Sequence, residues 1–267
     1  YLNCGIKMAV ASSTDTGVYG NAGGHSLSPG LIRTYVKADL LSVFEIVKGF
    51  RRGATFVTEG PLLDFKMAKK GIGELVEIPD CRKTYLDCEI KASSISGVQS
   101  CELVKNGDVI KIIYPEAGKT EINTSFKVEI DNSCWFAVRC YGNTDRDIFP
   151  WSKKQLKAHS SPVYVQFGDK GMVPKQEDVA YFLKWLEKCR EFGRDWSKLN
   201  KDDGRRLNRY LDLIDKSESF YKSLLEKPRT WTMQEKKEKP LVIIHASDPH
   251  VSAVKTQFCS NLEMAIS

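Results

Sequence analysis

The sequence predicts a mixed, mainly β fold in three parts: an α/β portion at the start, an antiparallel β-sandwich in the middle and a helical hairpin after it. Three observations lead to this prediction. Residues 1–60 alternate strand-like and helical segments, residues 61–169 hold about eight short strand-like runs without a helix between them, and residues 174–227 carry apolar positions at helical spacing.

The first part, residues 1–60, has the pattern of an α/β edge. Residues 5–12 (GIKMAVAS) form an apolar run that predicts a buried strand, which opens into the Gly-, Ser- and Thr-rich loop of residues 13–29. Residues 33–38 (RTYVKA) predict a second strand. Ser42 can then cap a helix that Gly53 stops.

The middle part, residues 61–169, has the turn-separated short runs of a β-sandwich of roughly 100 residues. Its clearest hairpin is ELVKNGDVIKII, because Asn106 and Gly107 supply the positive φ angles of a tight type I′ turn. The expected strands are Leu62–Ala68, Leu75–Ile78, Tyr85–Ala92, Cys101–Lys105, Val109–Tyr114, Ser125–Ile130, Trp135–Tyr141 and Val163–Phe167.

Residues 174–227 predict two amphipathic helices that pack on each other and on a neighbour. We expect the turn between them at Gly193 and in the stretch 201–204. Residues 228–239 resemble a polar linker. The apolar run of residues 241–244 then predicts a buried strand, and hence a further domain in residues 240–267 that is cut off after its first strand.

Composition limits the classes of partner. The net charge is +6, but the basic residues are spread along the chain, and the densest run (EKKEK) mixes signs, which favours a solvated surface over a nucleic-acid site. No apolar run reaches the roughly 20 residues of a membrane span. The chain opens on Tyr1, so we expect the true N-terminus to be missing, and localisation stays open.

The eight cysteines include no C-x-x-C pair, which argues against a zinc knuckle. Four of them lie in or beside strand-like runs, where buried thiols that act as small hydrophobic groups are the expected interpretation. These four are Cys88, Cys101, Cys134 and Cys140.

Several motifs, in order, resemble one family. They are YLNCGIKMAVASSTDTG, GLIRTYVKAD, GFRRGATFVTEGPLL, ELVKNG, CWFAVRCYG, AHSSPVYV and EDVAYFLKWLEK. Over about residues 1–227 this order is similar to the C-terminal portion of PHP-type metallohydrolases, in the branch named after carbaryl hydrolase. Ala54 and Glu59 are mild departures from the family pattern.

The resemblance implies that residues 1–60 are the terminal fragment of an α/β (PHP) barrel with divalent Zn, Mn or Fe at its strand ends. Metal-activated water would attack an ester, amide or phosphoester of a small-molecule substrate in the parent protein. Asp15 matches the family's late metal ligand, although Gly17 stands where many members have His, and a turn aspartate that bonds its own backbone is the alternative.

The other family ligands lie on earlier strands that precede this chain. The resemblance therefore implies an upstream barrel as packing partner, and we expect the chain alone to be inactive and to bind no metal tightly. Arg33 would steady an anionic substrate, or else make a structural ion pair at the start of its strand.

The tail LVIIHASDPHVSA resembles the opening motif of calcineurin-like metallophosphoesterases. That resemblance implies that Asp248 and His250 are metal ligands, whereas His245 lies on the strand. The alternative is a strand that ends in an Asp-Pro turn.

Other residues leave a different class of function open. His25 lies in the loop near Asp15, where it could either approach the metals or be exposed to solvent, and His159 is expected to make a structural contact at the boundary between sandwich and barrel. A β-sandwich that binds carbohydrate or protein without catalysis is the main alternative, with Trp135, Trp151 and Tyr141 as an aromatic platform or, equally well, as core residues.

Overall fold

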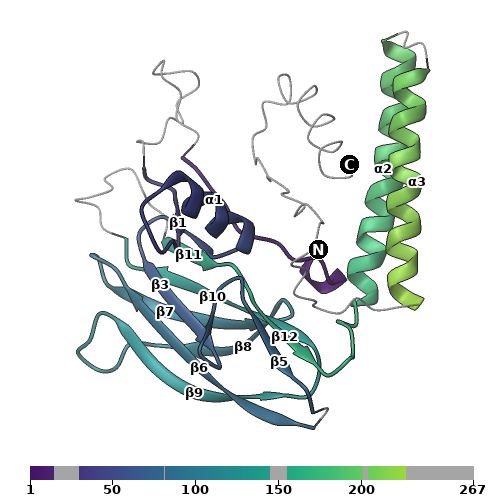
Figure 1. Cartoon of the computed structure of the whole chain (residues 1–267). Helices are drawn as coiled ribbons and strands as arrows, with labels where there is room; N and C mark the ends of the chain where they lie inside the picture. The colour runs from purple at the N-terminus through teal and green to yellow at the C-terminus, as the bar shows by residue number, and fades with distance from the viewer. Residues whose placement is uncertain (15–29, 81, 145–154, 201–203, 227–267) are drawn as a thin grey trace.

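The computed structural model describes residues 1–14, 30–80, 82–144, 155–200 and 204–226. It contains two β-sheets packed face to face and a pair of long C-terminal helices that stands beside them (Figure 1). The prediction of a mainly β chain with a helical pair is therefore confirmed. No barrel is formed by the described residues, where the predicted α/β barrel fragment was expected.

The larger sheet has eight strands. These are β1 (Arg33–Val36), β2 (Thr55–Thr58), β5 (Leu75–Ile78), β7 (Val98–Lys105), β8 (Asp108–Ile113), β10 (Cys134–Gly142), β11 (Leu156–Ser160) and β12 (Val163–Phe167). All its pairings are antiparallel except the parallel one between β5 and β12. Because β2 pairs with β11, residues on both sides of the predicted boundary at residues 60 and 61 belong to one sheet.

The smaller sheet has four strands in the order β4-β3-β6-β9. They are β3 (Leu62–Met67), β4 (Lys70–Gly71), β6 (Thr84–Ser93) and β9 (Ile122–Ile130). Inward-facing side chains such as Ile90 and Ile130 are fully buried against the larger sheet. Outward-facing positions pair opposite charges across strands, as Asp87 does with Lys127, so this face is a solvated one.

Local signals position several elements as predicted. Asn106 (φ 52°) and Gly107 (φ 93°) connect β7 to β8 in the left-handed turn that the sequence indicated. The Ser42 hydroxyl accepts a hydrogen bond from Glu45 N at 3.2 Å and caps α1 (Val43–Arg52), and Gly53 ends that helix at φ 72°.

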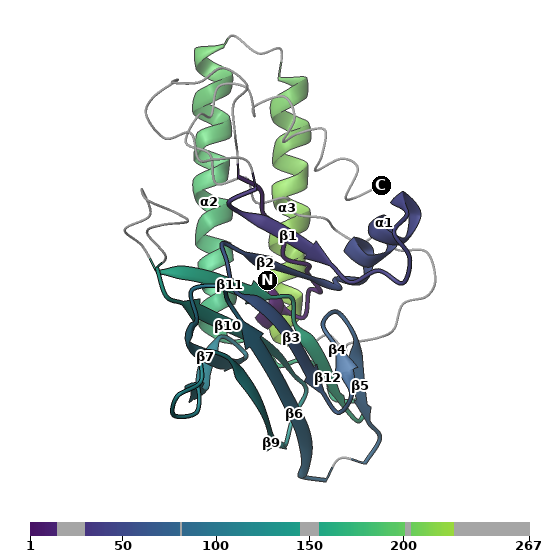
Figure 2. The same ribbon diagram turned by 90° about the vertical axis from the view of Figure 1, so that its left-hand side faces the viewer.

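The predicted strand at residues 5–12 is wrong. Residues 2–4 form a short 3₁₀ helix, η1 (Leu2–Cys4), and residues 6–14 are extended but belong to no sheet. We call residues 6–14 the crossing segment, because it runs over the larger sheet from β12 to β1 (Figures 1 and 2). An apolar run alone cannot distinguish a buried strand from an extended segment that lies on a sheet.

The two C-terminal helices, α2 (Gln176–Leu199) and α3 (Arg205–Glu226), pack antiparallel. The prediction of a turn at Gly193 is wrong, because α2 continues through it. Gly193 is buried beneath the ring of Tyr210, and a Cβ there would lie 2.5 Å from Tyr210 Cε1. The glycine thus allows close approach of the helices. None of the described helices is long and apolar enough to span a membrane.

The helical pair is attached to the sandwich through the first residues of the chain. Asn3 Nδ2 donates to Asp178 Oδ2 at 2.8 Å, while Asn3 Oδ1 accepts a hydrogen bond from Trp135 Nε1 at 2.8 Å. The ring centroids of Tyr1 and Phe182 lie 4.5 Å apart. The side-chain amide of Asn3 therefore links α2 directly to β10.

Candidate functional site

A row of hydroxyl groups holds the crossing segment on the larger sheet. Tyr164 Oη accepts a hydrogen bond from Met8 N at 2.9 Å and donates to Met8 O at 3.1 Å. Thr34 Oγ1 makes the same pair of bonds with Ser12, at 2.8 and 2.7 Å. Backbone groups that would otherwise seek a neighbouring strand are therefore satisfied by side chains.

At the centre of the row the hydrogen bonds form a closed ring. Val10 N donates to Ser161 Oγ at 3.0 Å, and Thr55 Oγ1 donates to Val10 O at 2.7 Å. Since the Thr55 proton is used in that bond, Ser161 Oγ must donate across the remaining 2.9 Å to Thr55 Oγ1. Thr55 and Ser161 are fully buried, so this ring fixes the path of the segment.

The crossing segment ends at the edge of the sheet. Thr14 Oγ1 donates to Ile32 O at 3.1 Å and accepts from Ile32 N at 3.2 Å. The chain positions that adjoin this pair are Asp15 and Arg33. Asp15 lies outside the described residues, and the structure fixes only the point from which it departs.

A depression of about 230 Å³ lies beside this point, lined by Ser12, Ile32 and residues of β2, β10 and β11. One row of directly opposed positions runs through it: Thr34, Val57, His159, Arg139 and Glu102 face each other across five strands. The row brings a histidine, an arginine and a glutamate onto the sheet face that carries the crossing segment.

The orientation of His159 is fixed by its backbone contact. His159 Nδ1 lies 2.8 Å from the Ser160 carbonyl oxygen, which can only accept, so Nδ1 carries the proton and Nε2 is left as a base. Burial lowers the pKa of His159, the positive charge of Arg139 lowers it further, and the Ser160 contact opposes them. The imidazole is therefore neutral at pH 7, in the form that binds a metal or accepts a proton.

Arg139 is engaged by an acid. Its Nε lies 2.9 Å from Glu102 Oε2 in an ion pair, although the direction of the contact does not fit a hydrogen bond. Tyr141 Oη also donates to Glu102 Oε2 at 3.2 Å. Glu102 thus offsets the positive charge of Arg139.

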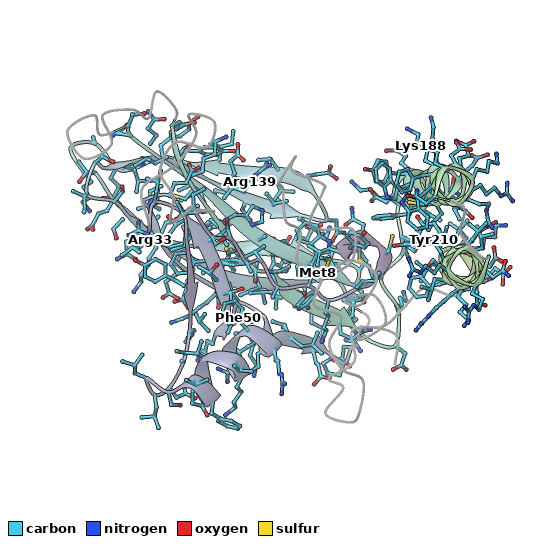
Figure 3. The ribbon with its side chains drawn as sticks, turned by 90° about the horizontal axis from the view of Figure 1, so that it is seen from above. Met8, Arg33, Phe50, Arg139, Lys188 and Tyr210 are labelled. Atoms are coloured by element: carbon cyan, nitrogen blue, oxygen red, sulfur yellow. The ribbon has the colours of Figure 1, made fainter. Side chains whose placement is uncertain are left out.

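Arg33 lies on the other face of the sheet. It is opposite Thr58 rather than Val57, and side chains alternate along a strand, so Arg33 is separated from the row that contains His159. Its guanidinium carbon lies 5.8 Å from the Tyr35 ring, and its Nε is buried without a hydrogen-bond partner among the described residues. Figure 3 shows Arg33 and Arg139 at the same end of the larger sheet.

The remaining candidate ligands lie outside the described residues. They are Asp248, His250, His245 and His25. Within the described part of the chain, no group of three or more His, Cys, Asp or Glu side chains could hold a metal ion.

The aromatic platform expected of a carbohydrate-binding module is not assembled from the described residues. Trp135 is buried, with 7% of its surface exposed, and its Nε1 is satisfied by Asn3. Tyr141 is half-buried and bonded to Glu102, and Trp151 lies outside the described residues. Trp135 is therefore a core residue: it belongs to the small buried cluster on the face of the larger sheet that points away from the smaller sheet.

No protein-family model, curated protein or solved structure matches this chain. The His159–Arg139–Glu102 row was not predicted as a site, because its members are far apart in sequence and only strand register brings them together. The resemblance had indicated the AHSSPVYV segment, which contains His159 and Ser161, but it gave no information on the register.

Proposed function

We propose that this chain is the β-rich portion of a metal-dependent hydrolase of the PHP type. The single observation that carries the proposal is the path of the crossing segment. Ser12 and Thr14 are held by hydroxyl contacts at the depression that His159 and Arg139 line, and Asp15 follows at once. Thr14, the residue before Asp15, is thus bonded to Ile32, which lines the same depression as His159.

In this proposal Asp15 supplies an oxygen ligand for Zn, Mn or Fe, and the bound metal supplies an activated water for ester, amide or phosphoester hydrolysis. His159 Nε2, kept unprotonated by burial, is placed to hold a proton or a ligand at the rim. Arg33 lies on the opposite face of the sheet. In this proposal it can therefore contact only those substrate groups that reach around the edge strand β1.

One carboxylate and one imidazole do not hold a metal cluster. The proposal therefore takes the other ligands from polypeptide outside the described residues, including the upstream barrel that the resemblance implies as a packing partner. The Asp248–His250 pair belongs to the same proposal as the start of a second, phosphoesterase-like centre in residues 240–267.

The test is metal analysis and hydrolysis by the protein expressed from its complete reading frame. We expect Asp15→Asn to lower bound metal by about one equivalent and to reduce hydrolysis of 4-nitrophenyl acetate or bis(4-nitrophenyl) phosphate at least tenfold. Asp64→Asn is the matched control, because Asp64 is an exposed acid on the smaller sheet whose ion pair within the described part of the chain is with Lys66, at 3.7 Å. Unchanged metal content and rate in Asp15→Asn would refute the proposal.

A further inference from the structure

The helical pair carries an exposed apolar strip along one flank. Trp185, Phe192 and Leu199 follow one another at seven-residue spacing on α2, and 53%, 59% and 84% of their surfaces are exposed. Soluble proteins rarely leave large apolar side chains aligned in this way without a partner.

The packing register of the helices shows which flank this is. Phe182 stacks on Tyr221 with 4.8 Å between ring centroids, and Tyr210 lies on Gly193. These contacts fix an antiparallel coiled coil in which Val179, Phe182, Leu186, Cys189 and Gly193 face α3 at alternating spacings of three and four.

The two flanks of this coiled coil differ in character. On one flank Arg190 bridges Asp215 and Glu218, at 2.7 and 2.8 Å. The strip lies on the other flank, where the same register places Leu213 of α3 beside it. Phe220 is not part of the strip, because it packs against the cluster of Cys4, Val179, Tyr221 and Leu224. We define the apolar flank as Trp185, Phe192, Leu199 and Leu213.

We propose that the apolar flank binds a second copy of this chain, so that two helical pairs form an antiparallel four-helix bundle with two-fold symmetry. The inference rests on the described helices and not on the proposed hydrolase function. With the two-fold axis at Phe192 and Leu213, each of these residues meets its own copy. Trp185 then meets Leu199 of the other copy, because the two are equally distant from Phe192 along α2.

Charges around the flank fit this arrangement. The same axis brings Lys188 near Asp195 of the second copy, and Asp195 near its Lys188. Asp195, which pairs with Lys198 at 3.3 Å within its own helix, thereby gains a second cation in each copy. Lys188 and Asp195 are both exposed, and Lys188 lies on the side of α2 away from α3 (Figure 3).

Size and space also permit the bundle. The three strip residues expose on the order of 400 Å² per copy, so the two copies together bury on the order of 800 Å², the size of a weak, reversible interface. The residues from Trp185 to Leu199 overlap over about 21 Å. The end of α2 of the second copy then lies beside Trp185, about 13 Å along α2 from Gln176 and near Tyr1, whose ring packs on Phe182.

The test is sedimentation velocity of the full chain across about 1–100 µM. We expect a monomer–dimer equilibrium, with a dissociation constant raised at least tenfold by Phe192→Lys without loss of helical circular dichroism. Lys188→Asp and Asp195→Lys should each weaken the dimer, and the double variant should restore it, which a merely structural effect on the helices would not do.

Crosslinking tests the symmetry directly. Phe192→Cys should give a disulfide-linked dimer on mild oxidation, whereas Glu187→Cys, an exposed position on the other side of α2, should not. A monomer at every concentration would overturn the inference, including the case in which residues 227–267 cover the flank. A dimer that Phe192→Lys leaves unchanged would overturn it as well, because another surface would then hold the copies together.

Discussion

Thr55→Val tests whether the closed ring of hydrogen bonds holds the crossing segment. The substitution keeps the shape of the side chain but removes the hydroxyl that donates to Val10 O and accepts from Ser161. Two hydrogen bonds are lost: the part-buried Val10 carbonyl loses its donor, and the buried Ser161 hydroxyl loses its acceptor, although it still accepts from Val10 N. Each unsatisfied group costs about 1–3 kcal/mol, and burial of the new methyl returns roughly 0.8 kcal/mol. We expect a net loss of about 2–4 kcal/mol.

The assay is urea unfolding of the full chain, followed by circular dichroism and tryptophan fluorescence. Thr34→Val is the matched control, because it removes the same two kinds of bond, to Ser12, at an exposed position where water can replace them. We expect that control to cost less than about 1 kcal/mol. If Thr55→Val costs no more than Thr34→Val, the ring does not hold the segment, and the account of how Asp15 is positioned fails with it.

Three further predictions concern packing and protonation. Gly193→Ala should destabilise the chain by about 1–2 kcal/mol in urea unfolding, because overpacking against Tyr210 exceeds the gain of about 1 kcal/mol in helix propensity; in a Tyr210→Ala background the same change should stabilise. The pKa of His159 is lowered in the folded state, so the unfolded chain takes up more protons as pH falls through about 6.5. Its contribution to stability is therefore present at pH 7–8 and decreases below about 6.5, and His159→Gln should flatten this part of the pH profile; an unchanged profile contradicts the assignment. Burial raises the thiol pKa of Cys88 and of Cys134 to about 12, so both should resist Ellman's reagent until the chain unfolds, and rapid labelling of the folded protein would contradict this.

Most of the sandwich could be predicted from local patterns. Alternating burial defines strands such as β6 and β9, and Asn106-Gly107 specifies its turn regardless of the rest of the fold. The four strand cysteines are buried, as the sequence indicated, and the structure shows that they are free. Elements whose partners are distant were harder to predict: β11 (LKAHS) has a short and mixed pattern, and only its pairing with β2 and β10 makes it a strand.

The errors share a physical cause. Residues 5–12 have the composition of a buried strand, but hydroxyl groups of Tyr164, Ser161, Thr55 and Thr34 take the place of a neighbouring strand. At Gly193, a residue that commonly ends helices is instead used for close packing. In both cases the deciding partner lies elsewhere in the chain, and the composition of the segment does not reveal it.

The anchoring of the first residues has a consequence for the order of folding during synthesis. Met8 is held by Tyr164, Val10 by Ser161, and Asn3 by Asp178, partners that lie 156, 151 and 175 positions later. Residues 3–10 therefore cannot complete these three contacts until β12 and the start of α2 have also left the ribosome. At about 5–20 residues per second, the contacts wait on the order of ten seconds or more. During that interval the apolar residues of this segment are available to chaperones, and the sandwich is complete only when residues 3–10 have been fixed on it.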